Sequence, residues 1–140
     1  MKSHIADISI INEIHDLHLV TPGEGWAISG LHSDNSSTLI HYLHGQWEID
    51  STWQNIKLND IEMVSTEEGW AVGEFFPNGL GIILHYKDRQ WSIVEGIDAH
   101  PVRSITMVSP TDGWAISTDD AHSRSTLLRC EDGVWTDYPS

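Results

Sequence analysis

Histidines, acidic residues and a lone cysteine are the side chains of this 140-residue chain whose chemistry would suit a metal site or an active site. Two histidine pairs have a spacing found among metal ligands, His15 with His18 and His41 with His44. Both pairs fall in strand-like segments, where side chains three positions apart point to opposite faces. The pattern therefore predicts neither a metal site nor a cofactor.

Potential nucleophiles lack the sequence context that would activate them. The serines are scattered without the tight turn of a nucleophile elbow, and there is no glycine-rich phosphate-binding loop. Cys130 takes the place of a tyrosine at a strand position, where a half-buried thiol is expected rather than a catalytic one. As the single cysteine, it has no partner for an intrachain disulfide. We therefore predict that the protein is not an enzyme.

The charge of the chain limits its partners. Twenty-one acidic residues against seven Lys and Arg give a net charge of −14 at pH 7. Nucleic acids and anionic membranes attract clustered positive charge, so neither is expected to bind. No window approaches 18 apolar residues, and the N-terminus lacks the continuous apolar run of a signal peptide. A cytoplasmic location is therefore favoured.

A 44-residue repeat organises the elements that must position any site. Six tryptophans form two series whose successive members are 44 residues apart: Trp26, Trp70 and Trp114, and Trp47, Trp91 and Trp135. The stretch Ile61–Ile93 recurs without a gap at Leu17–Ile49 and at Ile105–Asp137. A period of about 40 to 50 residues is typical of propeller blades. Tryptophans that recur at one repeat position are expected to pack between blades rather than bind a ligand.

Each repeat contains four strand-like runs. In the second repeat they are Ile61–Val64, Trp70–Gly73, Ile82–Tyr86 and a run that opens at Trp91. Four short strands without helical periodicity predict an all-β fold made of β-propeller blades, each blade having four antiparallel strands. A β-prism or another stacked β-repeat is the alternative. The glycine before each first-series tryptophan (Gly25, Gly69 and Gly113) is predicted to have a positive φ and to close the first hairpin.

The repeat boundaries give the predicted domain organisation, which is one repeat domain. Residues 1–16 are an extra N-terminal strand with a linker, 17–60 the first blade, 61–104 the second and 105–140 the third. Ile5–Ile11 is the extra strand. Asp50–Asp60 and Glu95–Ser104 are predicted to be linkers that cross from the outer edge of one blade to the inner edge of the next.

The repeated motif resembles a known group of propellers. The pattern M-V-S-x-x-x-G-W-A-[IV]-[GS], followed by [IL]-[IL]-H-Y-x-x-x-x-W, resembles BNR/Asp-box repeats. It is more closely similar to Ycf48-type photosystem assembly factors and to related, mostly uncharacterised bacterial propeller proteins. The resemblance covers Leu17–Tyr138 and implies a propeller fold. The Ser/Thr-x-Asp head of an Asp box is missing, and the arginines lack the context of a sialidase site.

Three blades do not close a ring, because closed propellers typically have 4–8 blades. The outer faces of the first and third blades would expose apolar surface, which costs about 25 cal/mol per Å². Two copies packed head to tail make six blades, so a homodimer is expected, with Ile5–Ile11 pairing on the third blade of the partner. The three blades would also be explained if the chain were a fragment of a longer propeller, or a newly duplicated or designed repeat protein.

Positions that break the repeat are the candidate ligand-binding residues, because packing between blades does not dictate them. They lie in the loops between the second and third strands and in one linker: His32, Asp34, Phe75, Phe76, Asp119, Asp120, His122 and Trp53. Acidic residues cluster in the other turns, which share the opposite rim. That rim is predicted to be a solvated acidic face, with a basic partner or a weakly bound divalent cation as the alternative ligand.

Two functions follow. The first is a non-enzymatic scaffold or protein-interaction module assembled from half-propeller subunits. The alternative is a glycan-binding lectin that uses aromatic side chains of the loops, such as Trp53 and Phe75, and between the blades. A glycosidase-like enzyme would need a facing pair of carboxylates that the sequence does not indicate. The expected partner is a second copy, with a glycan or a protein as the possible ligand.

Overall fold

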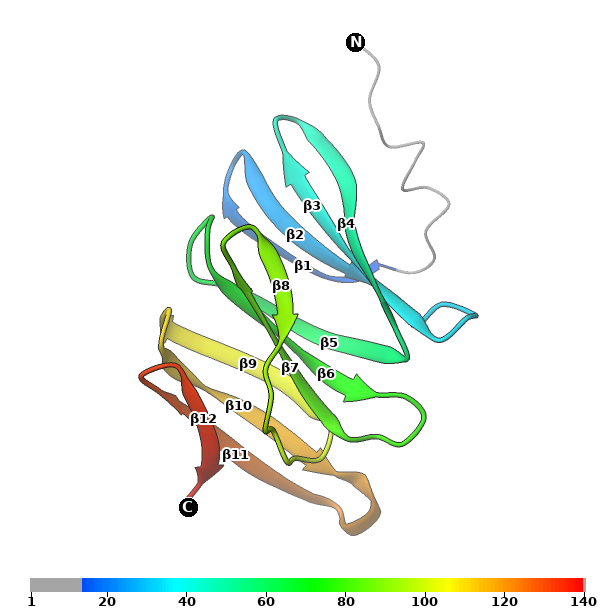
Figure 1. Cartoon of the computed structure of the whole chain (residues 1–140), viewed down its shortest axis with the longest axis vertical. Coiled ribbons are helices and arrows are strands. Elements are labelled where there is room, and N and C mark those ends of the chain that lie inside the picture. The colour runs from blue at the N-terminus through cyan, green and yellow to red at the C-terminus, as the bar shows by residue number, and fades with distance from the viewer. Residues whose placement is uncertain (1–13, 140) are drawn as a thin grey trace.

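Twelve strands in three antiparallel sheets form the protein, for which we describe residues 14–139 of a computed structural model (Figure 1). The first sheet contains β1 (Ile14–Thr21), β2 (Glu24–Ser29), β3 (Ser36–Leu43) and β4 (Gln46–Gln54). The second contains β5 (Ile56–Met63), β6 (Gly69–Phe75), β7 (Gly81–Lys87) and β8 (Gln90–Ile93). The third contains β9 (Val102–Ser109), β10 (Asp112–Asp119), β11 (Arg124–Glu131) and β12 (Val134–Tyr138).

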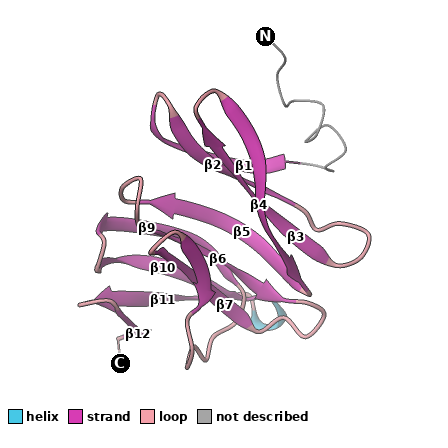
Figure 2. Cartoon of the chain, turned by 45° about the horizontal axis from the view of Figure 1, so that its top comes forward, coloured by secondary structure: helices cyan, strands magenta, loops and turns pink. Residues whose placement is uncertain are grey.

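Each sheet is one four-stranded meander whose strands pair in chain order. We call the three sheets blades 1, 2 and 3. This arrangement confirms the prediction of an all-β fold with three four-stranded blades. Within residues 14–139 the one helical element is the 3₁₀ helix η1 (Asp120–His122), drawn in cyan in Figure 2. No helix in this part of the chain is long and apolar enough to cross a membrane.

Two apolar cores hold the blades together, one between each pair of neighbours. Trp26 of blade 1 packs edge-on to Trp91 of blade 2, with ring centroids 5.4 Å apart. Trp70 of blade 2 packs in the same way on Trp135 of blade 3, at 5.7 Å. The repeat position of these tryptophans thus places a large buried ring at both contacts between blades.

The glycine before each first-series tryptophan is needed for space, and the prediction of a positive φ was wrong. Positive φ occurs at other glycines, and Gly25, Gly69 and Gly113 are not among them. A Cβ on Gly69 would lie 2.3 Å from the Met63 sulfur and 2.9 Å from a backbone oxygen of β5. Equivalent short distances occur at Gly25 and Gly113. Close contact with the innermost strand therefore selects glycine here.

The predicted linker Asp50–Asp60 is not present. β4 continues to Gln54 and β5 begins at Ile56, so only Asn55 separates the two blades. Asn55 has a φ of 59°, a left-handed conformation that asparagine tolerates. The second connection does resemble a linker, because Val94–Pro101 lies between β8 and β9 outside any strand. The extra strand predicted at Ile5–Ile11 lies outside the described residues.

Candidate functional site

In all three blades, an acidic residue near the start of the second strand is bonded to a histidine or arginine of the third strand, at the same repeat position. Oε2 of Glu24 lies 2.8 Å from Nε2 of His41, and the His41 ring stacks on Trp26 with centroids 4.1 Å apart. Blade 2 repeats this arrangement with Glu68, His85 and Trp70. Blade 3 has an arginine in place of the histidine: Arg129 is bonded to Asp112 and lies over the Trp114 ring. His41 and His85 are therefore packing residues of their strands.

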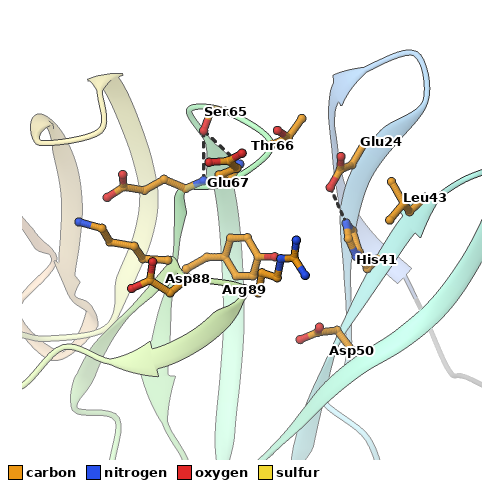
Figure 3. A pocket seen from close by; sticks show the side chains of 12 residues that line it. Glu24, His41, Leu43, Asp50, Ser65, Thr66, Glu67, Asp88 and Arg89 are labelled. Carbon is orange, nitrogen blue, oxygen red and sulfur yellow. Dashed lines mark hydrogen bonds and ion pairs between the residues drawn. The ribbon is translucent and has the colours of Figure 1, made fainter.

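A cleft of about 800 Å³ lies between blades 1 and 2 (Figure 3). Blade 1 lines it with Glu24, His41, Leu43 and Asp50. Blade 2 lines it with two turns, Ser65–Glu68 between β5 and β6 and Tyr86–Arg89 at the end of β7. In Figure 3 the blade 1 side chains lie across from those of blade 2, of which Arg89 extends toward blade 1 and Asp88 is turned away from it. These two turns, which the sequence predicts to lie on the same rim, both line the cleft in blade 2.

The lining of the cleft is mainly acidic. Five carboxylates line it, against one lysine and one arginine: Glu24, Asp50, Glu67, Glu68 and Asp88. Burial raises the pKa of Tyr86 in the cleft wall, and the negative charges of Asp50 and Glu24 add to this shift. A cationic group would therefore be attracted to this space, and an anionic group would be repelled.

The residues predicted as a binding rim are mostly engaged in local contacts. The Asp34 carboxylate accepts hydrogen bonds from the backbone N–H and the hydroxyl of Ser36, which lower the pKa of Asp34. Nε2 of His32 lies 2.9 Å from the Thr38 hydroxyl. These bonds shape the connection between β2 and β3, and no hydrogen bond or ion pair among the described residues joins this loop to the candidate loop residues of blade 3.

The third-blade candidates form ion pairs. Asp119 is bonded to His122 at 2.7 Å, and this hydrogen bond, together with the charge of His100, lowers the pKa of Asp119. Asp120 pairs with Arg103 at 2.6 Å, and Arg103 also pairs with Glu74 of blade 2. Arg103 of β9 thus links Glu74 of β6 to Asp120 of η1 through opposite charges.

The aromatic candidates are placed differently from the prediction. Trp53 lies within β4 and not in a linker, it is half-buried against the first interblade core, and its Nε1 donates to the Ser51 hydroxyl at 2.9 Å. Phe75 ends β6 and packs against the same core. Phe76 is 36% exposed and is followed by Pro77. Phe76 is therefore the most exposed of the three rings.

Cys130 is fully buried, and burial raises the pKa of its thiol to about 11. Because the thiolate is the reactive form, this environment suppresses nucleophilic chemistry at neutral pH. Among residues 14–139, no group of three or more His, Cys, Asp and Glu side chains is arranged to hold a metal ion.

Two carboxylates on the innermost strands compete for one hydrogen-bond donor. The backbone N–H of Ile61 donates to Asp16 at 3.1 Å and to Asp60 at 2.9 Å. Asp60 also accepts from the backbone N–H of Ile105 at 2.9 Å and so links blade 2 to blade 3. Burial and the neighbouring Asp16 carboxylate raise the pKa of Asp60 to about 6.

The raised pKa of Asp60 beside Asp16 predicts that the free energy of unfolding decreases as pH rises. Between about pH 4 and pH 6 the folded chain keeps a proton at Asp60 that the unfolded chain releases, so the free energy of unfolding falls through this window. We expect Asp60→Asn to stabilise the fold by about 1–2 kcal/mol at pH 7.5, because the amide carries no charge and can donate to Asp16.

Urea unfolding of the parent and Asp60→Asn chains at pH 4.5 and pH 7.5 checks this expectation. The difference between the two chains should grow with pH. Asp137→Asn, which makes the same chemical change at an exposed position, is the control. A smaller gain from Asp60→Asn at pH 7.5 than at pH 4.5 would contradict the assignment of the shared proton.

The outer faces of blades 1 and 3 are the other unusual surfaces of the chain. On blade 3 the outer face carries Ile116 and Leu127, which are 40% and 42% exposed, beside the half-buried Trp114. On blade 1 it carries Leu17 and Leu19, which are 56% and 52% exposed. These positions correspond in the repeat to residues that are buried at the two internal contacts between blades.

Comparison with known proteins supports the fold and leaves the function open. No protein-family model matches the chain, and no curated protein sequence matches it. Among solved structures it is similar to a chain described as YCF48 bound to D1 peptide, with a TM-score of 0.59 and 19% sequence identity. The match covers 89% of this chain and 38% of that chain. The predicted resemblance to Ycf48, a BNR-repeat β-propeller, is thus confirmed in fold, and the protein is a partial β-propeller by comparison.

Proposed function

We propose that this partial β-propeller is a non-enzymatic scaffold or protein-interaction module that closes by pairing head to tail with a second copy. The supporting observation concerns the contact between neighbouring blades, which occurs twice inside the chain. The outer face of blade 3 carries the residues of one side of this contact, and the outer face of blade 1 carries those of the other side. In that contact a tryptophan of the second strand of one blade packs on a tyrosine or cysteine and a tryptophan of the next blade.

Blade 1 carries the receiving half in a preformed state. The rings of Tyr42 and Trp47 lie 5.0 Å apart at 38°. The rings of Tyr86 and Trp91, which receive Trp26 inside the chain, lie 5.1 Å apart at 40°. Because the two pairs have the same geometry, the outer pair needs no rearrangement to receive a tryptophan. Ile40 beside it is already buried, and the exposed Leu17 and Leu19 on the same face are the other apolar side chains that a partner would cover.

Blade 3 carries the inserting half. Trp114 has the repeat position of Trp26 and Trp70, and the Arg129 guanidinium lies 4.8 Å from its ring centre. Ile116 and Leu127 beside it correspond to Val72 and Ile83, which are fully buried where blade 2 meets blade 3. Covering these side chains with a partner would remove apolar surface from water, and this stabilises association.

Two copies joined in this way contain six blades, which lies within the range of closed propellers. The contact of blade 3 with blade 1 of the partner occurs twice and is related by a rotation, so no face is left open. Additional blades of a longer chain are the competing explanation for the open faces.

Light scattering over a dilution series tests the proposal. We expect a stable species with twice the 15.7 kDa mass of the chain. A folded species that keeps the single-chain mass at all concentrations would contradict the proposal. Heterogeneous aggregation would indicate that the open faces require blades from a longer chain and would also count against pairing of two copies.

A matched pair of lysine substitutions locates the contact. Leu127→Lys should shift the mass to that of one folded chain, because its repeat equivalent Ile83 is fully buried and an unpaired buried charge is costly. Val134→Lys should leave the mass unchanged. Its repeat equivalent in blade 2, Gln90, remains exposed when blade 3 packs on blade 2, so Val134 should also remain exposed when a partner packs on blade 3. Equal masses for the two variants would exclude this surface as the contact.

The glycan-binding alternative has less support. It relies on Trp53 and Phe75 as exposed loop aromatics, and both rings pack against the first interblade core. Stacking on a sugar needs an exposed aromatic face, and packing against the core covers part of both rings. The polar candidates beside them are held in local hydrogen bonds and ion pairs.

A further inference from the structure

The fourth strand of blade 3 covers only part of the third strand. In blade 1, β4 pairs with the whole of β3, including its first residues, 36–38. In blade 3, β12 ends at Tyr138, and its pairing with β11 begins at Leu127. The first residues of β11, 124–126, are the repeat equivalents of 36–38, and among the described residues they pair with β10 alone.

Both other blades cover this part of the third strand with backbone. In blade 2, the backbone N–H of Val94 donates to the Ile83 oxygen at 2.9 Å, and that of Gly81 donates to the Ala99 oxygen at 2.8 Å. In blade 1, residues 36–38 are at most 5% exposed, whereas residues 124–126 of blade 3 are all exposed. An uncovered strand edge presents backbone N–H and C=O groups to which another strand can add.

The segment before β1 has the repeat position of the half-strand that would cover this edge. The spacing of 44 residues aligns Ile5 with Ile49 and Ile93, and it aligns residues 7–10 with the last residues of β4, 51–54. In blade 1, Asn55 alone separates β4 from β5, so a fourth strand leads directly into the first strand of the next blade. The sequence therefore predicts that the segment before β1 ends the fourth strand of a blade that lies against the open face of blade 1.

Blade 3 of the same chain is too far away to receive this segment. Blade 2 lies between blades 1 and 3 (Figure 1). Packed sheets are about 10 Å apart, so two spacings amount to about 20 Å. The chain from Ile10 to Ile14, where β1 begins, can span at most about 14 Å. In the proposed head-to-tail assembly, by contrast, blade 3 of the second copy lies directly beside blade 1.

We propose that residues 7–10 of one copy pair with residues 124–126 of β11 in the second copy and so complete the fourth strand of its blade 3. Each copy would donate one such segment to the other. This inference rests on the proposed assembly and names the backbone pairing that closes it. Transferring the register of β3 and β4 places Ser9 opposite Ser125, at the positions of Trp53 and Ser37.

The apolar character of the segment agrees with this register. Ile8 would lie opposite Thr126, which is on the same face of β11 as Leu128. Leu128 belongs to the core between blades 2 and 3, and a cavity of about 210 Å³ beside it is lined in part by Ile97. An isoleucine at this position would cover apolar surface of that cavity. Its equivalent in blade 1, Thr52, is polar and exposed.

Disulfide formation between two full-length variants tests the pairing. Chains with Ser9→Cys are refolded together with chains that carry Ser125→Cys, and the mixture is oxidised. Opposite residues of paired strands lie about 4.5–5.5 Å apart, which permits a disulfide. We expect a linked species of twice the 15.7 kDa mass on a non-reducing gel, and none from either variant alone. Cys130 stays in place because it is fully buried. Thr136→Cys is the matched control, because β12 would adjoin the segment only if the segment added as a fifth strand.

Two gel results would overturn the proposal: no linkage of Ser9→Cys to Ser125→Cys chains, or stronger linkage to Thr136→Cys chains. Deleting residues 1–10 is a second readout that removes no described strand, and it should weaken self-association at least about tenfold because the added backbone hydrogen bonds are lost. An unchanged dissociation constant would count against the pairing. Light scattering of the parent chain separates the two failures. A single-chain mass contradicts both the assembly and the pairing, whereas a stable pair of copies without the Ser9–Ser125 link contradicts the pairing alone.

Discussion

Replacing Trp70 with alanine is expected to destabilise the chain by about 3–5 kcal/mol, the range for deleting a large aromatic side chain from a core. Trp70 is 2% exposed and packs between blades 2 and 3. Its loss removes the stack on His85 and the edge contact with Trp135, and it leaves the Pro110 carbonyl without its donor. The surrounding sheets cannot collapse fully into the space, so a cavity adds to the lost burial.

Trp114→Ala is the matched control for this prediction. Trp114 has the same repeat position, but no further blade of the chain covers it, and its ring contacts are with Arg129 and Tyr138. We expect a loss of about 1 kcal/mol, consistent with an exposed cation–π contact and partial burial. Urea unfolding in the Leu127→Lys background measures both variants without a contribution from self-assembly. Equal losses for the two tryptophans would contradict the assignment of Trp70 to an interblade core.

Gly73→Ser is expected to destabilise the chain by about 2–3 kcal/mol, although the repeat suggests that it should be harmless. Ser29 and Ser117 occupy this repeat position in blades 1 and 3. In blade 2, however, a Cβ on Gly73 would lie 2.0 Å from the backbone oxygen of Lys57 and 2.9 Å from the Leu58 Cα. These atoms belong to β5 and cannot rotate away, so the pairing of β5 with β6 must open.

Gly23→Ala is the control for the glycine prediction, because a Cβ at Gly23 meets no atom within 4 Å. It should change the free energy of unfolding by less than about 0.5 kcal/mol. Thermal and urea unfolding of both variants give the comparison. If Gly73→Ser is as stable as the parent, β5 can shift from β6 without cost and the repeat consensus is the better guide.

The 44-residue repeat alone predicts much of the fold. The 44-residue period correctly predicts three blades of four strands each, and four of the six recurring tryptophan rings lie between neighbouring sheets. The strand around each first-series tryptophan and the strand before each second-series tryptophan lie where the pattern places them.

The predictions fail where one residue type satisfies two different physical requirements. Glycine permits a positive φ and also permits close approach of two strands, and the sequence alone does not distinguish these uses at Gly25, Gly69 and Gly113. Polar residues are common both in linkers and in exposed strand positions. Polarity therefore predicts a linker at Asp50–Asp60, although β4 and β5 cover nearly all of it.

The candidate site is harder to predict than the fold. Loop residues that break the repeat are candidates because packing does not dictate them, yet Asp34, Asp119 and Asp120 are held by neighbours close in space. The sequence does predict that the acidic turns share one rim. The cleft residues Tyr86 and Asp50 give no separate signal, because they belong to strands and their exposure depends on the neighbouring blade.

The sequence by itself determined the period, the number of blades and four of the residues that pack between them, Trp26, Trp70, Trp91 and Trp135, because large rings at a fixed interval favour burial between equivalent sheets. Only the tertiary structure decided how each contact between blades is completed. Trp26 and Trp70 have the same repeat position and the same ring placement, but only Trp70 reaches an acceptor. That difference depends on the path of the facing turn at Thr66 or Pro110. The spacing of backbone atoms across a contact is a property of two packed blades and is not specified by the sequence of either one.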